Sequence, residues 1–213
     1  MKMNSFTKNK GAVVLAAGYS RRMSSFKPLL DVGGKPAIQR VIDALKDGGI
    51  PQTVIVTGYN RELLLSFIDG INTVEAYNAE YDQGMFSSVL TGIRKLLEIS
   101  GNSLEGFLLT PVDQAAVTSD IIRLIISDEN VCSKFVVACY MGKSGHPLWV
   151  PFRFIDEILS CSGDAGVRGV TEKYADEVVR LETGAKSVVM DMNTDEEYEK
   201  LLAYWEKTGE KRL

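Results

Sequence analysis

The chain has 213 residues, of which 45% are hydrophobic and 24% are charged, and its formal net charge is -4 at pH 7. This length allows a substantial buried core, and the composition excludes a disordered chain and a membrane protein. The acidic balance argues against a nucleic-acid partner, because a nucleic-acid groove needs a basic face. The N-terminal segment "MKMNSFTKNK" lacks the apolar centre of a signal peptide, so we expect a cytoplasmic protein without a membrane partner.

The expected domain organisation is simple. Residues 1–10 form a flexible N-terminal tail, residues 11–207 form a single domain, and residues 208–213 form a C-terminal tail. No internal repeat or low-complexity linker divides the long middle segment. Its length is also within the usual size of one domain, which is roughly 100–200 residues.

Short apolar runs alternate with helical patterns in chain order, which is typical of an α/β fold with a mostly parallel sheet. The expected strands cover Ala12–Leu15, Thr53–Thr57, Thr73–Tyr77, Gly106–Thr110, Phe135–Tyr140 and Val178–Leu181, with Ser187–Met190 as a further candidate. Apolar residues spaced by three and four positions predict helices. These helices cover Ala37–Asp47, Arg61–Ile68, Phe86–Ile99 and Ser119–Ser127.

Two segments of the C-terminal half have their own signals. Gly142–Val150 contains glycines, a histidine and a proline, and we expect an irregular excursion of the kind that often carries function. Thr194 is the predicted cap of the last helix, and Glu197 is its capping-box partner three residues later.

The stretch "AAGYSRRMSSFK" after the first expected strand combines small residues with cations. Because it leaves the carboxyl end of a strand, it lies at the sheet edge where open α/β folds bind ligands. Ala16, Ala17 and Gly18 let a ligand approach backbone N–H groups, while Arg22 and Lys27 bring positive charge. This combination suits a polyphosphate, although neither G-x-x-x-x-G-K-[ST] nor G-x-G-x-x-G is present. The alternative is an ordinary loop with solvated arginines.

The same stretch is part of a longer pattern. "LAAGYSRRMSSFKPLL" resembles the signature L-A-A-G-x-S-x-R-M-G-x-x-K-x-L-L of MobA-like nucleotidyltransferases. "NAEYDQGMFSSVLTGI", "LLTPVDQAAV", "SGHPLWV", "GDAGVRGV" and "VVMDMNTDEEYEKLL" are similar, in the same order, to elements of the molybdenum cofactor cytidylyltransferase branch. The resemblance extends from Gly11 to about Leu202. It implies a three-layer, Rossmann-like nucleotidyltransferase fold whose mostly parallel mixed sheet is flanked by helices.

The resemblance also implies a reaction. The terminal phosphate of the molybdenum cofactor, a molybdopterin-type compound, attacks the α-phosphorus of CTP and pyrophosphate leaves, which gives molybdopterin cytosine dinucleotide. The implied metal is Mg²⁺, with Mn²⁺ as a substitute, and the implied acceptor protein is a molybdenum hydroxylase. Because a phosphate nucleophile is already ionised at neutral pH, positioning and charge neutralisation carry this catalysis.

Matching positions take their roles from the resemblance. The catalytic residues are Lys27, Arg22 and Asp113. The nucleotide-binding residues are Leu15, Ala16, Ala17, Gly18, Ser20, Gly84, Ser87 and Ser88. The metal ligands are Asp113, Asp191 and Asn193, and the acceptor-binding residues are His146, Asp164 and Arg168. Plainer roles stay open for the serines as helix caps, for His146 as a loop residue, and for Asp164 and Arg168 as a surface ion pair.

Three positions depart from the family pattern. Ser24 replaces a glycine, Ala115 replaces a proline, and Asn193 replaces a second aspartate. Three other readings therefore stay open: a transferase specific for GTP or a sugar phosphate, a non-catalytic cofactor-binding partner of a molybdoenzyme, and an NADPH-dependent reductase of the same family.

Overall fold

The computed structural model describes residues 9–20, 22–23, 25–68, 73–161 and 165–208. In this part of the chain one seven-stranded sheet has the order β3-β2-β1-β4-β6-β5-β7. Its strands are β1 (Asn9–Leu15), β2 (Gln52–Thr57), β3 (Val74–Tyr77), β4 (Leu104–Pro111), β5 (Phe135–Tyr140), β6 (Lys143–Pro151) and β7 (Val178–Glu182). Neighbouring strands are parallel except β6, which is antiparallel to both β4 and β5. The sheet is therefore mostly parallel and mixed, as the sequence predicts.

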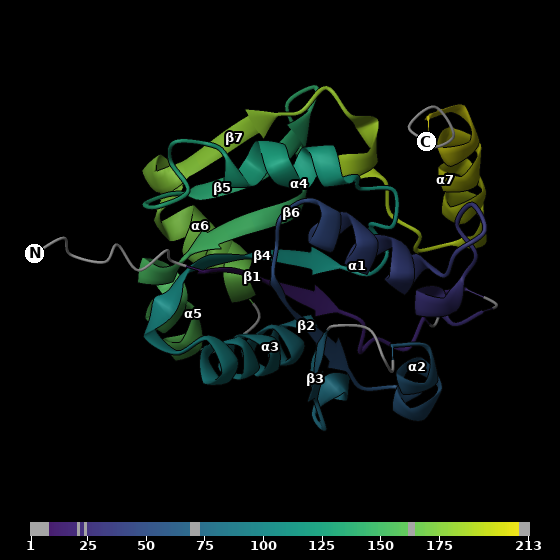
Figure 1. The fold of residues 1–213 in the computed structure, drawn as a ribbon, viewed down its shortest axis with the longest axis horizontal. Coiled ribbons are helices and arrows are strands. Elements are labelled where there is room, and N and C mark those ends of the chain that lie inside the picture. Colours follow the sequence, from purple (N-terminus) through teal and green to yellow (C-terminus); the bar gives the residue numbers. More distant parts are fainter. Residues whose placement is uncertain (1–8, 21, 24, 69–72, 162–164, 209–213) are drawn as a thin grey trace, which may run out of the picture.

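Helices cover both faces of this sheet (Figure 1). The longer helices are α1 (Ala37–Asp47), α2 (Arg61–Ile68), α3 (Met85–Ser100), α4 (Ser119–Ile126), α5 (Ile155–Ser160), α6 (Gly166–Lys173) and α7 (Asp195–Thr208). Two short 3-10 helices also concern the site, namely η1 (Lys27–Leu29) and η6 (Lys186–Val189). One core lies between the sheet and the face of α1, α2, α4 and α7, and the other lies against α3, α5 and α6. The α/β, three-layer fold class is confirmed.

The side chains of β1 show why both faces must be covered. Ala12 and Val14 enter the first core, while Val13 and Leu15 enter the second, and all four are buried. A parallel strand covered on both sides is apolar at every position, because neither set of alternating side chains meets water. This is why the first expected strand reads as an uninterrupted apolar run.

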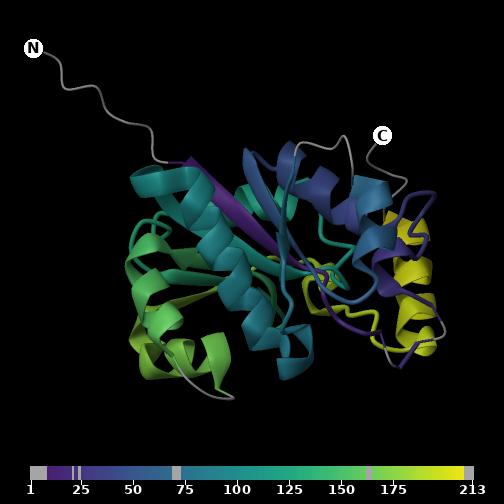
Figure 2. The same ribbon diagram turned by 90° about the horizontal axis from the view of Figure 1, so that it is seen from below.

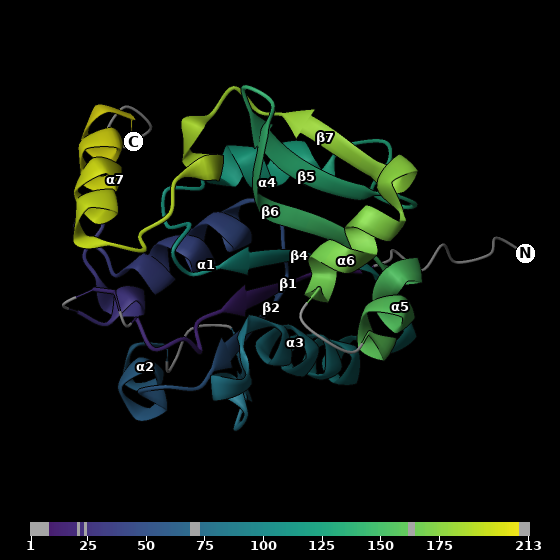
Figure 3. The same cartoon turned by 180° about the vertical axis from the view of Figure 1, so that it is seen from behind.

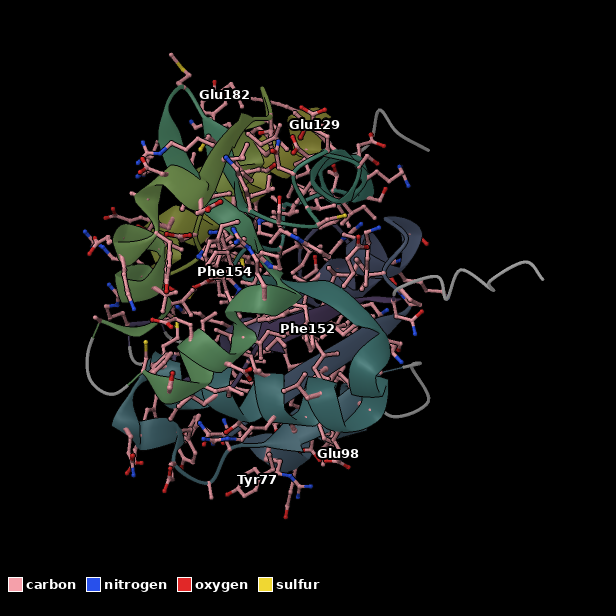
Figure 4. All side chains as sticks on the ribbon, turned by 90° about the vertical axis from the view of Figure 1, so that its left-hand side faces the viewer. Tyr77, Glu98, Glu129, Phe152, Phe154 and Glu182 are labelled. Carbon is pink, nitrogen blue, oxygen red and sulfur yellow. The ribbon has the colours of Figure 1, made fainter. Side chains whose placement is uncertain are left out.

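The sheet extends across the molecule between two edge strands. Figure 4 shows Tyr77 and Glu182 at opposite ends of the molecule, and they belong to the edge strands β3 and β7. Phe154 lies between them in the second core, where it stacks on Phe135 with ring centroids 4.3 Å apart. Phe152, two residues earlier, is 42% exposed.

The segment expected to be irregular is a strand, so that prediction is wrong. β6 includes all of this segment except Gly142, and it pairs Leu148 with Leu109 of β4 and with Val137 of β5. A tight turn at Met141 and Gly142, both with positive φ, connects β5 directly to β6. Gly145 suggested a loop, yet it is required by close packing: a Cβ there would lie 1.7 Å from the Val188 carbonyl oxygen.

Three smaller boundaries also differ from expectation. Ser187–Met190 is not a strand, because residues 186–189 form η6. Asn9 and Lys10, assigned to the N-terminal tail, pair with β4, and Lys10 forms an ion pair with Glu105 at 3.1 Å. Helix α7 ends at Thr208, one residue beyond the predicted domain boundary. The remaining tail residues, 1–8 and 209–213, lie outside the described part of the chain.

A search of the described helices for a membrane-spanning segment finds none with the necessary length and apolar character.

Candidate active site

The carboxyl ends of β1 and β4 meet at one edge of the sheet. These two strands are parallel neighbours, and Leu15 lies opposite Pro111. The Val112 N–H donates to the Leu15 carbonyl at 3.0 Å, which ties the two following loops together. The chain therefore brings the Gly18 loop and Asp113 to the same place, as expected for the ligand-binding edge of an open α/β sheet.

The loop after β1 begins as an extension of the sheet. The Ala16 N–H donates to the Val56 carbonyl, and the Ala17 carbonyl accepts from the Tyr59 N–H at 3.1 Å. The Ala16 N–H is therefore already used, which corrects the expectation that it is offered to a ligand. Gly18 is exposed, and a Cβ added there would meet nothing within 4 Å. A ligand can reach the backbone at this position.

Ser20 anchors the segment that carries Lys27. Ser20 has a φ of 55°, in the left-handed region that few non-glycine residues adopt. Its hydroxyl accepts a hydrogen bond from the Lys27 N–H at 3.1 Å. Because Ser20 uses its side chain in this way, the structure gives it a local role in shaping the loop.

The Lys27 ammonium lies between two acceptors. Its Nζ donates to the Asn193 Oδ1 at 2.7 Å and is 3.7 Å from the Asp113 Oδ2. The side chains of Lys27 and Asp113 are only 14% and 18% exposed. The structure thus brings together three sequence-predicted residues from distant parts of the chain.

Asp113 is a buried carboxylate with an unfilled acceptor. Burial raises the pKa of the Asp113 carboxyl, and Asp191 raises it further, while Lys27 and His146 act in the opposite direction. The Asp113 Oδ1 is buried without a hydrogen-bond partner among the described residues. A buried acceptor in this state is costly unless a cation or donor completes it.

His146 reaches the same edge because β6 runs in the opposite direction. The β4–β6 pairing extends to Leu109 and Leu148, and His146 lies two residues before Leu148, where it lines the larger cavity together with Asp113. Burial lowers the pKa of the His146 imidazole, and its Nδ1 has no hydrogen-bond partner within the described structure. His146 is therefore a half-buried strand residue whose imidazole lies near the Asp113 carboxylate.

Gln114 is a site residue that the sequence reasoning quoted but did not assign. Its side-chain amide donates to the Asp191 Oδ1, and only 1% of the residue is exposed. The Gln114 Oε1 is the third buried polar atom that lacks a partner in the described residues. Its position directly after Asp113 in "PVDQ" is the signal that identifies it.

The start of α3 is held by Asn78. The Asn78 side-chain amide donates to the hydroxyls of Ser87 and Ser88, at 2.9 Å and 3.0 Å. Ser87 also donates to the Gly84 carbonyl at 2.8 Å, and Gly84 has a φ of 101°. These bonds support the plainer role of both serines in shaping the turn before the helix.

Two adjoining cavities open at this edge. The smaller has a volume of about 400 Å³, and its predicted residues are Leu15, Ala16, Ala17, Gly18, Ser20, Arg22, Lys27, Gly84, Ser88 and Asp113. The larger has a volume of about 1460 Å³, and its predicted residues are Leu15, Gly84, Ser87, Asp113, His146, Arg168, Asp191 and Asn193. Its wall includes residues of α3 and α6, which cover the same face of the sheet, and Figure 3 shows these two helices. Asp113 lines both cavities, so it marks their junction.

The other two expected acceptor-binding residues are Arg168 and Asp164, and the structure describes only Arg168. Arg168 lines the larger cavity, but its side chain is 87% exposed and pairs with Glu172 at 2.7 Å. Asp164 lies outside the described residues, so the expected Asp164–Arg168 pair is not tested. Arg22 lies on the wall of the smaller cavity and is exposed.

The residues at the junction suit a hard divalent cation. The unpartnered Asp113 Oδ1 and the nearby Asp191 carboxylate are oxygen donors, the type that Mg²⁺ and Mn²⁺ bind. Among the described residues no cluster of three or more His, Cys, Asp or Glu side chains is present. Such a site therefore needs oxygens from a substrate, which is usual for Mg²⁺ held by one or two carboxylates. The Asn193 Oδ1 already accepts from Lys27, so it is less suited to this role.

The comparison with protein families decides the classification. Residues 12–178 match the family model of the MobA-like NTP transferase domain. The chain belongs to this family. The match begins within β1 and ends at the first residue of β7.

Curated relatives of this MobA-like chain include a bifunctional protein and a cytidylyltransferase. It is 26% identical to the bifunctional protein GlmU of Desulfitobacterium hafniense over 188 residues, which cover 86% of this chain and 36% of GlmU. It is 29% identical to the 2-aminoethylphosphonate cytidylyltransferase of Lancefieldella rimae over 145 residues, covering 63% of this chain and 52% of the relative. The chain thus spans about a third of the length of GlmU and half that of the cytidylyltransferase.

Solved structures share the MobA-like fold. Rv0371c from Mycobacterium tuberculosis aligns with a TM-score of 0.79 and 24% identity, covering 92% of this chain and 99% of that chain. A nucleotidyl transferase from Methanothermobacter aligns with a TM-score of 0.80 and 20% identity, covering 94% and 99%. A further Rv0371c structure, a complex with manganese, aligns with a TM-score of 0.72. At these identities the alignments establish the fold.

Proposed function

We propose that the chain is a nucleotidyltransferase, which transfers a nucleotidyl group from an NTP to a phosphorylated acceptor and releases pyrophosphate. One observation carries this proposal: the Lys27 ammonium, in the wall of the smaller cavity, lies 3.7 Å from the carboxylate of Asp113, which lines both cavities. The smaller cavity receives the NTP along the Gly18 loop. The larger cavity receives the acceptor, whose phosphate then meets the α-phosphorus at the junction.

Each side chain at the junction has a distinct task in this reaction. Lys27 and Arg22 neutralise charge that moves onto the leaving pyrophosphate, and a partly buried cation does this more effectively than a solvated one. Asp113 and Asp191 hold Mg²⁺ or Mn²⁺, which when bound neutralises phosphate charge and orients the phosphate oxygens. The acceptor phosphate is already ionised, so His146 is not required as a base. It closes the pocket beside Asp113 and offers Nδ1 to the acceptor.

We further propose that the nucleotide is CTP and that the acceptor is the terminal phosphate of the molybdenum cofactor. The larger cavity, at about 1460 Å³, exceeds the roughly 300–1,000 Å³ of ordinary small-molecule pockets, which favours a polycyclic acceptor over a sugar phosphate. The sequence elements similar to the molybdenum cofactor branch include His146, Asp113 and Gln114, and all three line this cavity. The cytidylyltransferase among the relatives also supports the choice of base.

Thermal unfolding with CTP, GTP, ATP, UTP and NADPH, each with and without Mg²⁺, tests these assignments. A ligand at about 100 times its dissociation constant adds about 2.7 kcal/mol to the free energy of unfolding. We expect CTP with Mg²⁺ to give the largest rise in unfolding temperature. We then expect pyrophosphate release from CTP only when molybdenum cofactor is added.

Other outcomes would redirect the proposal. Stabilisation by GTP instead of CTP would reassign the base, and pyrophosphate release with a sugar phosphate would reassign the acceptor. Stabilisation by NADPH alone would favour a reductase. Binding of molybdenum cofactor without any pyrophosphate release would favour a non-catalytic partner of a molybdoenzyme.

A further inference from the structure

A chain of two hydrogen bonds connects the last helix to Lys27. The Glu197 Oε2 accepts from the Asn193 N–H at 2.8 Å, and the Asn193 Oδ1 accepts from the Lys27 Nζ at 2.7 Å. Lys27 and Glu197 do not touch each other in this arrangement, and Asn193 bridges them. We infer that Glu197 is a positioning residue for the Lys27 ammonium and acts through Asn193. Its consequence for turnover rests on the proposed function.

The Lys27 side chain needs this support because the hydrogen bond that holds its backbone lies far from the ammonium group. The Lys27 N–H is held by Ser20 and the next residue, Pro28, is buried, but these contacts leave the long side chain free to rotate. A lysine loses much rotamer entropy when it is fixed, so the fixing contact must be well placed itself. The Asn193 amide provides this contact only while Glu197 holds the Asn193 backbone in place.

The neutral Asn193 side chain also keeps two charges separate. Without the Asn193 Oδ1, the ammonium would keep the Asp113 Oδ2, now 3.7 Å away, as its partner. A tight Lys27–Asp113 pair would neutralise the cation meant for the triphosphate and block the carboxylate meant for the metal. The departure from aspartate at position 193 therefore has a physical use, because an amide oxygen holds the lysine without cancelling its charge.

Helix α7 and the Lys27 segment are also joined further along. The Tyr198 hydroxyl donates to the Asp31 carbonyl at 2.5 Å, one residue after Glu197 on α7 and four after Lys27 on the loop. The Trp205 ring lies 4.3 Å from the Arg40 guanidinium, and the Arg40 Nε donates to the Val32 carbonyl at 2.6 Å. Figures 1 and 2 both show α7 beside the purple segment that follows β1. These contacts hold α7, which carries Glu197, in a fixed position relative to the segment that carries Lys27.

The capping function of Glu197 can be separated from its positioning function. The Thr194 Oγ1 accepts from the Glu197 N–H at 3.2 Å, and this bond caps the helix without involving Asn193. Thr194→Ala therefore removes a cap bond alone, whereas Glu197→Ala removes the acceptor that holds Asn193. Glu196→Ala makes the same charge change as Glu197→Ala at a neighbouring exposed position of the same helix. Glu197→Gln keeps an oxygen that can accept from the Asn193 N–H.

The test measures the chemical reactivity of Lys27 in the full-length protein without nucleotide. Trace acetylation with acetic anhydride, followed by peptide mass spectrometry, reports how accessible the Lys27 amine is. We expect Glu197→Ala to raise Lys27 labelling by about threefold or more, because a loosened side chain opens more often. Labelling in Thr194→Ala, Glu196→Ala and Glu197→Gln is expected to match the wild type.

A kinetic measurement then tests the consequence for turnover. Misplacing a group near the reacting atoms by about 1 Å can cost up to about a hundredfold, so we expect kcat for pyrophosphate release to fall at least tenfold in Glu197→Ala. The KM for CTP should change less, and Glu197→Gln should restore most of kcat. Thr194→Ala should lower the unfolding temperature while leaving kcat unchanged.

The outcomes separate this inference from the proposed function. If Glu197→Ala lowers the unfolding temperature as Thr194→Ala does but leaves Lys27 labelling unchanged, Glu197 is only a cap and the inference fails. If labelling rises as expected while even the wild type releases no pyrophosphate, the positioning role stands and the proposed function fails. Equal labelling changes in Glu196→Ala would show a general charge effect and would also overturn the inference.

Discussion

At the scale of single residues, the site depends on charges removed from water. Lys27 and Asp113 are both less than a fifth exposed, so their electric fields are screened less than those of surface groups. The Asp113 Oδ1, the Gln114 Oε1 and the His146 Nδ1 are buried acceptors or donors without partners in the described structure. A fold rarely leaves three such atoms in one place. Their concentration around Asp113 indicates that a ligand completes them.

Lys27→Ala and Asp113→Asn are expected to reduce kcat for pyrophosphate release by about 10²–10³-fold each, the usual cost of losing one electrostatic contact to a transition state. Steady-state pyrophosphate release measures this effect, and circular dichroism checks that both variants fold. Lys35→Ala is a suitable control, because Lys35 pairs with Asp43 at the exposed surface. If either site variant kept the wild-type rate, its catalytic assignment would be wrong.

At the scale of elements, an antiparallel strand completes the site. β6 lies between β4 and β5 and begins at the edge where they end, so it delivers His146 to Asp113. η6 then crosses so close to β6 that Gly145 has no room for a side chain. This crossing carries the chain on to Asp191 and Asn193. η6 therefore occupies the position where the sequence predicted a strand, and it leads the chain to the site.

A cluster of hydrogen-bonded polar side chains fixes helix α2 to the edge strand β3. Arg61 at the start of α2 forms two hydrogen bonds with Glu75 of β3, at 2.7 Å and 2.8 Å, and the Thr57 hydroxyl donates to the same carboxylate. Burial alone would raise the pKa of Glu75, but the bonds from Arg61 and Thr57 outweigh it and lower the pKa. The folded state therefore binds this proton less readily than the unfolded state.

Glu75→Gln is expected to lower stability at pH 7 but not in acid. Because the Glu75 pKa is lowered in the folded state, its stabilising effect is present above the ordinary pKa of 4.5 and is lost as pH falls through the folded-state pKa. Urea unfolding at pH 7 should show a lower midpoint for the variant, and at pH 3 the two midpoints should approach each other. Glu129→Gln, at an exposed position, is the control. An equal difference at both pH values would contradict the assignment.

At the scale of the whole molecule, the sheet separates two cores. The site lies at the carboxyl ends of the central strands, just outside both cores. α3 and α6 shape the larger cavity on one side, while α7 contributes from the other side through the segment before it. Leu201 anchors α7 in the first core and is fully buried. The position of the last helix therefore depends on the same core that supports the central strands.

Leu201→Ala is expected to lower the free energy of unfolding by about 2–5 kcal/mol, the usual cost of emptying a buried leucine site. Urea denaturation monitored by circular dichroism measures the change. Lys200→Ala, at an exposed position one residue earlier, should stay within about 0.5 kcal/mol of the wild type. A loss as small as that of the control would mean that α7 is not supported by the core.

Much of the fold is predictable because its signals are local. The ranges of α1, α2 and β5 agree with the apolar periodicity, and those of β1, β2 and β4 differ only at their ends. The sequence does not predict β6, because Gly145 and Pro147 interrupt its apolar pattern. Both residues are accounted for only by tertiary contacts. Gly145 accommodates the backbone of η6, and Pro147 lies beside an irregular part of the β5–β6 pairing.

The sequence by itself determined the α/β class and the cationic loop after the first strand, and its resemblance to the MobA-like pattern proposed Lys27 and Asp113 as site residues. These features depend on residue type and on spacing within short segments. Only the tertiary structure decided that Asn193, 166 residues from Lys27, holds its ammonium, and that Gln114 holds Asp191 across 77 residues. Hydrogen bonds require atoms to approach within about 3 Å. Strand register and helix packing fix such distances, and neither is encoded in any one segment.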